Sequence, residues 1–217
     1  MNLPFTIDQF LEVFRRYNEA VWPTQIVLNM LALIAVGLAF WKNPNAGKLI
    51  SYILALLWFW TGIMYHFLFF SPINPVARVF GGLFLIQGGL IQWFGGVKDR
   101  IQFEFRLDAR RLSGAILIIY ALLIYPLIGG WIGHTYPLCP TFGAPCPTTI
   151  FTFGILLWVR ANFPRFLLII PALWSFIGFS AALNMGIKED IGLLVAGIVG
   201  TAWLAMLKPS ANTKTQD

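Results

Sequence analysis

Seven apolar stretches, each close to the length of a membrane-spanning helix, constrain the fold of this chain more than any other feature. They cover residues 21–41, 49–70, 76–97, 112–133, 147–163, 165–184 and 190–207. A helix needs about 20 residues to cross a hydrocarbon core about 30 Å thick. The pattern therefore predicts an all-α fold, a polytopic membrane bundle of seven transmembrane helices in one domain, residues 1–217.

Composition leaves little protein outside such a bundle. Of the 217 residues, 58% are hydrophobic and 11% are charged, whereas soluble domains carry about 25% charged residues. These proportions exclude an ordinary soluble domain and make the lipid bilayer the main partner. They leave open whether the chain forms a homo-oligomer.

Positive charge is concentrated in alternate connections between the apolar stretches. Four basic residues lie on one side: Arg15, Arg16, Arg78 and Lys188. The other 11 of the 15 are Lys42, Lys48, Lys98, Arg100, Arg106, Arg110, Arg111, Arg160, Arg165, Lys208 and Lys214. Basic connections stay cytoplasmic, so we expect the N-terminus outside and residues 208–217 as a cytoplasmic tail. This placement explains the net charge of +6 without a nucleic-acid partner.

The first twenty residues predict an amphipathic helix. Thr6 and Gln9 have the spacing of a capping box. Apolar residues recur at helical spacing from Ile7 to Tyr17, and charged residues fill the other face. We expect residues 1–20 to lie in the membrane interface or to pack across the outer mouth of the bundle, residues 21–207.

Two stripes of small residues predict close helix packing. The third stretch has glycine pairs at 81–82, 88–89 and 95–96, and the seventh has small residues at 192, 196 and 200. Each spacing returns to one side of a helix, where small residues let backbones approach in lipid. We therefore expect these two helices at the centre. Residues 101–108 alternate between apolar and polar side chains, which favours an extended segment at the cytoplasmic surface.

All the histidines and cysteines map to the outer side. His66 lies near the outer end of the second stretch, His134 ends the fourth, and Cys139 and Cys146 follow in a proline-rich loop. Glu19 could reach the same surface. Imidazole, thiolate and carboxylate are ligands for zinc, copper or iron, so these five residues are candidate ligands of a transition metal or haem. Alternatively, the two cysteines form a disulfide and His66 only hydrogen-bonds a neighbouring helix.

The same loop supports a second interpretation that needs no metal. Pro147 is well placed as the first residue of the fifth helix. Free N–H groups at a helix start favour an anion. Thr148, Thr149 and Thr152, together with the two histidines, could then bind an anionic or polar solute.

The carboxylates all map to the connections or to the two ends of the chain. Glu189 and Asp190 fall outside and Asp99, Glu104 and Asp108 fall inside, with no acid near the midplane. Proton- and ion-driven pumps usually place ionisable groups within the membrane. The sequence therefore argues against a carboxylate proton relay.

Residues 2–6, 17–23 and 133–149 together resemble an uncharacterised family of bacterial multi-spanning membrane proteins. The resemblance implies a multi-pass protein of the bacterial inner (cytoplasmic) membrane. It implies no activity and no functional residue.

Three classes of function remain open at this stage. The first is binding or transport of a metal ion or small polar solute at an outward-facing site around the histidines and the cysteine loop. The second is a membrane-embedded metalloenzyme or a thiol-redox enzyme that uses Cys139 and Cys146. The third is a structural or assembly partner in a membrane complex.

Overall fold

The computed structural model describes residues 4–41, 43–160 and 163–207, and these residues are mainly helical. The tail at 208–217, Lys42 and the first three residues lie outside the described part. The helices are α1 (Ile7–Val21), α2 (Thr24–Phe40), α3 (Ala46–Trp60), α4 (Ala77–Ile91), α5 (Ala109–Ile119), α6 (Tyr125–Trp131), α7 (Pro145–Leu156), α8 (Ile169–Met185) and α9 (Ile191–Ala205). Wider π-helical turns continue α3 to Phe70 (η1) and α4 to Val97 (η2), and η3 (Tyr120–Ile124) joins α5 to α6. Single 3₁₀ turns precede α8 (η4, Arg165–Leu168) and α9 (η5, Lys188–Asp190).

Fewer helices are long enough to span a membrane than the sequence predicts. Within the described residues, four continuous apolar helices reach that length: Ala46–Phe70, Ala77–Val97, Ala109–Trp131 and Arg165–Met185. A fifth span results if α1 and α2, bent by 85° against each other, count as one. The prediction of seven spans is therefore wrong. The stretch 147–163 forms only α7, with 12 residues, which is about 18 Å long.

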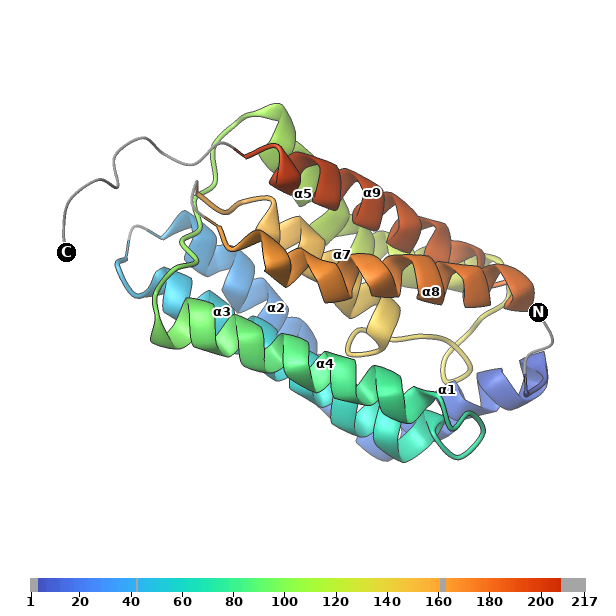
Figure 1. Cartoon of the computed structure of the whole chain (residues 1–217). Helices are drawn as coiled ribbons and strands as arrows, with labels where there is room; N and C mark the ends of the chain where they lie inside the picture. The colour runs from blue at the N-terminus through green and yellow to red at the C-terminus, as the bar shows by residue number, and fades with distance from the viewer. Residues whose placement is uncertain (1–3, 42, 161–162, 208–217) are drawn as a thin grey trace.

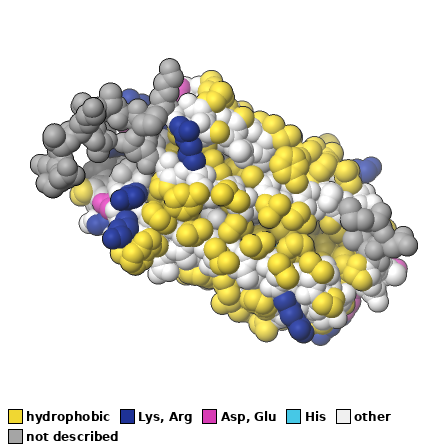
Figure 2. Space-filling model, viewed as in Figure 1, with side chains coloured by type: hydrophobic (Ala, Val, Ile, Leu, Met, Phe, Trp, Pro, Cys, Tyr) yellow, Lys and Arg dark blue, Asp and Glu magenta, His cyan; other side chains and the backbone are white. Residues whose placement is uncertain are grey.

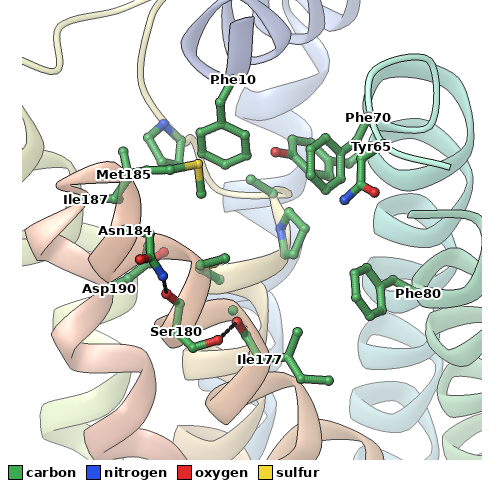
Figure 3. Close-up of a pocket in the computed structure, with 18 of the residues that line it drawn as sticks. Phe10, Tyr65, Phe70, Phe80, Ile177, Ser180, Asn184, Met185, Ile187 and Asp190 are labelled. Atoms are coloured by element: carbon green, nitrogen blue, oxygen red, sulfur yellow. Dashed lines mark hydrogen bonds between the residues drawn. The ribbon is translucent and has the colours of Figure 1, made fainter. Parts of the chain in front are cut away.

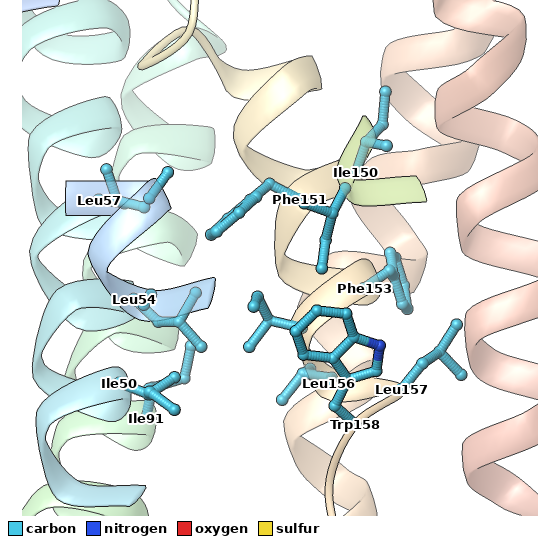
Figure 4. Packing of buried hydrophobic residues seen from close by; sticks show 14 of the residues in the cluster. Ile50, Leu54, Leu57, Ile91, Ile150, Phe151, Phe153, Leu156, Leu157 and Trp158 are labelled. Carbon is cyan, nitrogen blue, oxygen red and sulfur yellow. The ribbon is translucent and has the colours of Figure 1, made fainter. Parts of the chain in front are cut away.

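Figure 1 shows α2, α3 and α4 on one side of the molecule and α5, α8 and α9 on the other, with α7 between them. Apart from Cys146, every residue of α7 is buried. A helix that is apolar on all sides packs against protein on all sides. In Figure 4, Leu54 and Leu57 of α3 face Phe151 and Leu156 of α7 across the core. Because protein surrounds α7, its length does not have to match the bilayer.

The glycine stripe of α4 packs as expected on one side only. The members close to α3 or η1 are Gly81 and Gly88 of α4, with Gly95 and Gly96 of η2. A Cβ atom on Gly88 would lie 2.9 Å from the ring of Phe59, whereas Gly82 and Gly89 have no atom within 4 Å of that position. The prediction of close helix packing along this stripe is confirmed, and the partner is α3 with η1.

The most enclosed helix is α7, not α4 or α9 as the glycine stripes suggested. It crosses α5 where Gly114 meets Gly154, and a Cβ on Gly114 would lie 2.6 Å from the Gly154 carbonyl oxygen. On its other side Gly200 of α9 lies against Phe153. Of the small residues of α9, Gly200 therefore packs against α7, whereas Gly192 lies against Tyr120 of η3.

One end of the molecule gathers the basic connections, and we call it the basic end. Residues 101–105 run extended beside 158–160, with the Glu104 N–H donating to the Trp158 carbonyl (2.8 Å) and the Arg160 N–H to the Gln102 carbonyl (2.8 Å). This confirms the extended segment. Several Lys and Arg side chains are visible at this end in Figure 2, beyond a broad apolar face.

Candidate functional site

At the opposite end, α1 lies across the bundle (Figure 1), and we call this the α1 end. The predicted capping box is present, because the Thr6 side chain accepts from the Gln9 N–H and the Gln9 side chain accepts from the Thr6 N–H. Asn18, fully buried on α1, donates to the carbonyls of Pro137 (2.7 Å) and Cys139 (2.8 Å). These bonds hold the proline-rich loop against α1.

A cavity of about 350 Å³ opens at the α1 end between α1, η1, α4 and α8, and we call it the α1–α8 pocket. Its walls are mainly apolar, and their aromatic side chains include Phe5, Phe10, Phe14, Phe70, Phe80 and Trp174. Figure 3 shows Phe10 and Phe70 above the cavity, Phe80 on the α4 side, and Met185 and Ile187 near α8. Two chemically reactive side chains, Cys146 and Asp190, belong to the lining.

Two adjacent carboxyl groups are buried beside this pocket, and we call Glu189 and Asp190 the acidic pair. They sit on the 3₁₀ turn between α8 and α9, with Glu189 fully buried and Asp190 4% exposed. The Tyr125 hydroxyl donates to Asp190 Oδ1 (2.6 Å), and His134 Nδ1 lies 3.0 Å from Glu189 Oε1. The Tyr120 hydroxyl donates to the backbone carbonyl of Glu189 (2.6 Å). The turn is thus fixed by two tyrosines and a histidine.

The acidic pair has little positive charge around it. Among the described residues no Lys or Arg forms an ion pair with either acid, and Glu189 Oε2 is buried without a hydrogen-bond partner. Burial raises the pKa of Asp190 to about 7, although hydrogen bonds from Tyr125 and Cys146 act to lower it. The neighbouring Glu189 raises it further. A carboxyl group in this setting changes its charge near neutral pH.

His66 lies in a different environment from His134. Its ring is fully buried, with ring centroids 4.7 Å from Phe84 and 5.1 Å from Trp174. Neither ring nitrogen has a hydrogen-bond partner within the described part of the chain. The expectation that a neighbouring helix would satisfy this imidazole is therefore wrong.

The five predicted metal ligands do not come together. Glu19 is exposed and pairs with Arg15 at 2.7 Å, His66 is enclosed by aromatic rings, and His134 turns to Glu189. No group of three or more His, Cys, Asp or Glu side chains that could hold a metal ion occurs among the described residues. Cys139 and Cys146 are free thiols. The metal or haem site gains no support.

The three predicted solute-binding threonines are fully buried in the bundle. Thr149 donates to the Pro145 carbonyl (2.8 Å), and Thr152 donates to the Thr148 carbonyl (2.8 Å) while accepting from Trp58 Nε1 (3.0 Å). The helix begins at Pro145, two residues earlier than expected. Because Pro145 and Pro147 lack an N–H, only Cys146 offers one among the first three positions. The start of this helix therefore offers few N–H groups to an anion, and the predicted solute site gains no support there.

Sequence reasoning missed the acidic pair. The sequence predicts both acids on the outer side, at the start of the last apolar stretch, and gives no indication that they are buried. Only Gly186 to Asp190 separate α8 from α9. So short a turn at the end of two apolar helices is covered by α6, which contributes Tyr125. The available signal was an acid directly preceding an apolar stretch with a single basic residue, Lys188, beside it.

The fold and pocket thus define an all-helical protein with several apolar helices of membrane-spanning length and a cavity at one end. The chain belongs to the family described as "Family of unknown function (DUF6064)", which matches residues 7–214. The expected resemblance to an uncharacterised family is confirmed. No curated protein and no solved structure matches the chain.

Proposed function

We propose that this chain is an integral membrane protein that binds a small, mainly apolar molecule in the α1–α8 pocket. Support for the membrane comes from the long apolar helices and from large apolar side chains exposed around the bundle, among them Val27, Leu33, Leu56, Val79, Ile86, Leu123 and Ile198. The apolar face of Figure 2 fits contact with lipid. The basic end would face the cytoplasm and the α1 end the outside of a bacterial inner membrane.

The pocket itself is the observation that carries the binding function. Its volume of about 350 Å³ falls within the usual range of ligand sites, about 300–1,000 Å³. Aromatic and aliphatic walls with a few polar groups suit a compact apolar molecule better than the metal ion or polar solute expected from the sequence. The opening beside η1, α4 and α8 would admit a molecule from the membrane surface.

A thiol-redox enzyme is less well supported. Burial raises the pKa of Cys139 to about 11. The thiolate is the reactive form of cysteine, and little of it exists at neutral pH with such a pKa. Ligand binding in the α1–α8 pocket is therefore better supported than a thiol-redox activity.

A pocket-filling variant tests the proposal. Ala181 lines the pocket, whereas Leu183 on the same helix is 61% exposed. Ala181→Phe should weaken binding of a neutral aromatic probe, 4-fluoro-neopentylbenzene, by about tenfold, or 1.4 kcal/mol. Binding is followed by ¹⁹F NMR on purified protein, with empty micelles as the partition control.

Leu183→Phe is the matched control and should bind the probe like the unmodified protein. Equal binding by Ala181→Phe and the unmodified protein would place the probe elsewhere and contradict the proposal.

A further inference from the structure

The acidic pair presents a charge that the protein does not neutralise. A buried ionised carboxyl needs a partner of opposite charge or several hydrogen bonds. Glu189 has His134 at 3.0 Å, but Asp190 receives a hydroxyl hydrogen bond from Tyr125 and faces the pocket with no cation beside it in the described residues. When Asp190 is ionised, a positively charged molecule in the pocket would supply the missing charge.

The walls of the pocket point to the same kind of molecule. Aromatic ring faces carry partial negative charge and attract cations within about 6 Å. Phe10, Tyr65, Phe70, Phe80 and Trp174 all line the cavity that Asp190 lines. In Figure 3, Asp190 lies on the side of α8, and Tyr65, Phe70 and Phe80 lie on the side of η1 and α4. A cationic molecule that pairs with Asp190 and extends across the cavity would therefore meet aromatic rings on the opposite side.

Resting on the function proposed above, we propose that the ligand of the α1–α8 pocket is a lipophilic organic cation whose charged nitrogen pairs with the Asp190 carboxylate. The apolar part of such a molecule fills the aromatic cavity. Metal cations are disfavoured because, among the described residues, Asp190 belongs to no group of three or more His, Cys, Asp or Glu side chains that could hold a metal ion.

Protons should compete with the cation for the same carboxyl group. Protonation of Asp190, whose pKa burial raises to about 7, removes the charge that holds the cation. The other titratable groups facing Asp190 are Glu189, Tyr125, Cys146, Tyr120 and Tyr65, with His134 reached through Glu189. None of these is a Lys or Arg. For a permanently charged probe, affinity should fall about tenfold between pH 8 and pH 6, because the ionised fraction falls by that factor around a pKa of 7.

The experiment compares two probes of nearly equal shape. (4-Fluorobenzyl)trimethylammonium carries a permanent charge, and 4-fluoro-neopentylbenzene replaces its nitrogen with carbon. Both are titrated by ¹⁹F NMR into the unmodified full-length protein, Asp190→Asn and Asp8→Asn. Asp8 is an exposed acid of α1 at the same end of the molecule and does not line the pocket.

We expect Asp190→Asn to weaken the cation at least tenfold at pH 8 and the neutral probe less than twofold, with no change for Asp8→Asn. The pH series on the unmodified protein gives an independent readout if Asp190→Asn does not fold. Equal loss of both probes in Asp190→Asn, or cation binding independent of pH, would overturn the cation assignment. Neutral-probe binding that still responds to Ala181→Phe would then leave the apolar pocket standing. Failure of both probes to bind would overturn both proposals.

Discussion

Carboxyl groups at the two ends of this molecule differ in burial and in ion pairing. At the basic end, Glu104 pairs with Arg106 and Arg160, and hydrogen bonding from Arg106 holds the pKa of Glu104 below its usual range. At the α1 end, burial drives the pKa of Asp190 upward, and no Lys or Arg of the described residues forms an ion pair with it. Acids at the basic end therefore behave as surface ion pairs. The acidic pair at the α1 end is buried without a Lys or Arg partner among the described residues, and buried carboxyl groups with shifted pKa values are candidates for function.

The largest effect should come from labelling the two ends in intact cells. With Cys139 and Cys146 changed to Ser, a cysteine at the exposed Thr135 should react almost completely with an impermeant maleimide added outside. A cysteine at Gln102, at the basic end, should not react until the cells are opened. Labelling of Gln102→Cys from outside would reverse the proposed orientation.

Removing the buried charge at the α1 end should stabilise the protein at high pH. The folded-state pKa of Asp190 is about 7, against an ordinary value of 3.8. Its ionisation therefore disfavours folding progressively as the pH rises from about 4 to 7. Asp190→Asn should therefore raise the melting temperature at pH 8.5. The corresponding increase in the free energy of unfolding is about 2–4 kcal/mol.

At pH 4.5 the gain from Asp190→Asn should shrink to less than about 1 kcal/mol. Glu104→Gln is the control, and its free energy of unfolding should not increase at high pH. Equal melting of Asp190→Asn and the parent at both pH values would mean that the carboxyl is not buried as described.

An arginine at the basic end should matter through its hydrogen bonds. Arg110 is 8% exposed and donates to the carbonyls of Leu157 and Val159 just after α7. Arg110→Met leaves both carbonyls without that donor and should destabilise the fold by about 2–3 kcal/mol. Arg106→Met, on a 67% exposed side chain, is the control and should have little effect on thermal unfolding.

The smallest effect should come from an ion pair at the basic end. Glu104→Gln should destabilise by about 0.5 kcal/mol, as exposed pairs do. Because the folded-state pKa of Glu104 is lowered, its contribution should be present at neutral pH and disappear as the pH falls through that pKa. Differential melting at low and high salt checks this, and an effect that survives 1 M NaCl would point to a structural role instead.

Local signals in the sequence were reliable guides to structure. The capping box at Thr6 and the inward glycines of α4 depend on neighbours a few residues apart, and both are present. The clustering of basic connections at one end also survived, although the number of long spans did not. The charge pattern depends only on which connections lie at the same end of the molecule. A short helix such as α7 still leads the chain from one end to the other, so the pattern does not require every helix to be long.

Features that depend on the enclosure of a segment were not predictable. Hydropathy does not distinguish an apolar helix surrounded by lipid from one surrounded by protein, so α7 was read as a full span. Likewise, the burial of Asp190 was not predicted, because nothing in its own segment indicates that Tyr125 and Cys146 contact it. The metal ligands were grouped by side of the membrane, which is too coarse to bring His66 and His134 together.

The enclosure of α7 also has a consequence for biosynthesis. A 12-residue apolar segment is too short to be retained alone by an insertion machinery that samples about 20 residues at a time. One wall of its final surroundings, α9, is translated after it. We expect residues 145–156 to enter the bundle only once residues 191–205 have left the ribosome. Alkaline extraction of membranes should therefore release chains stalled before residue 190 more readily than completed chains.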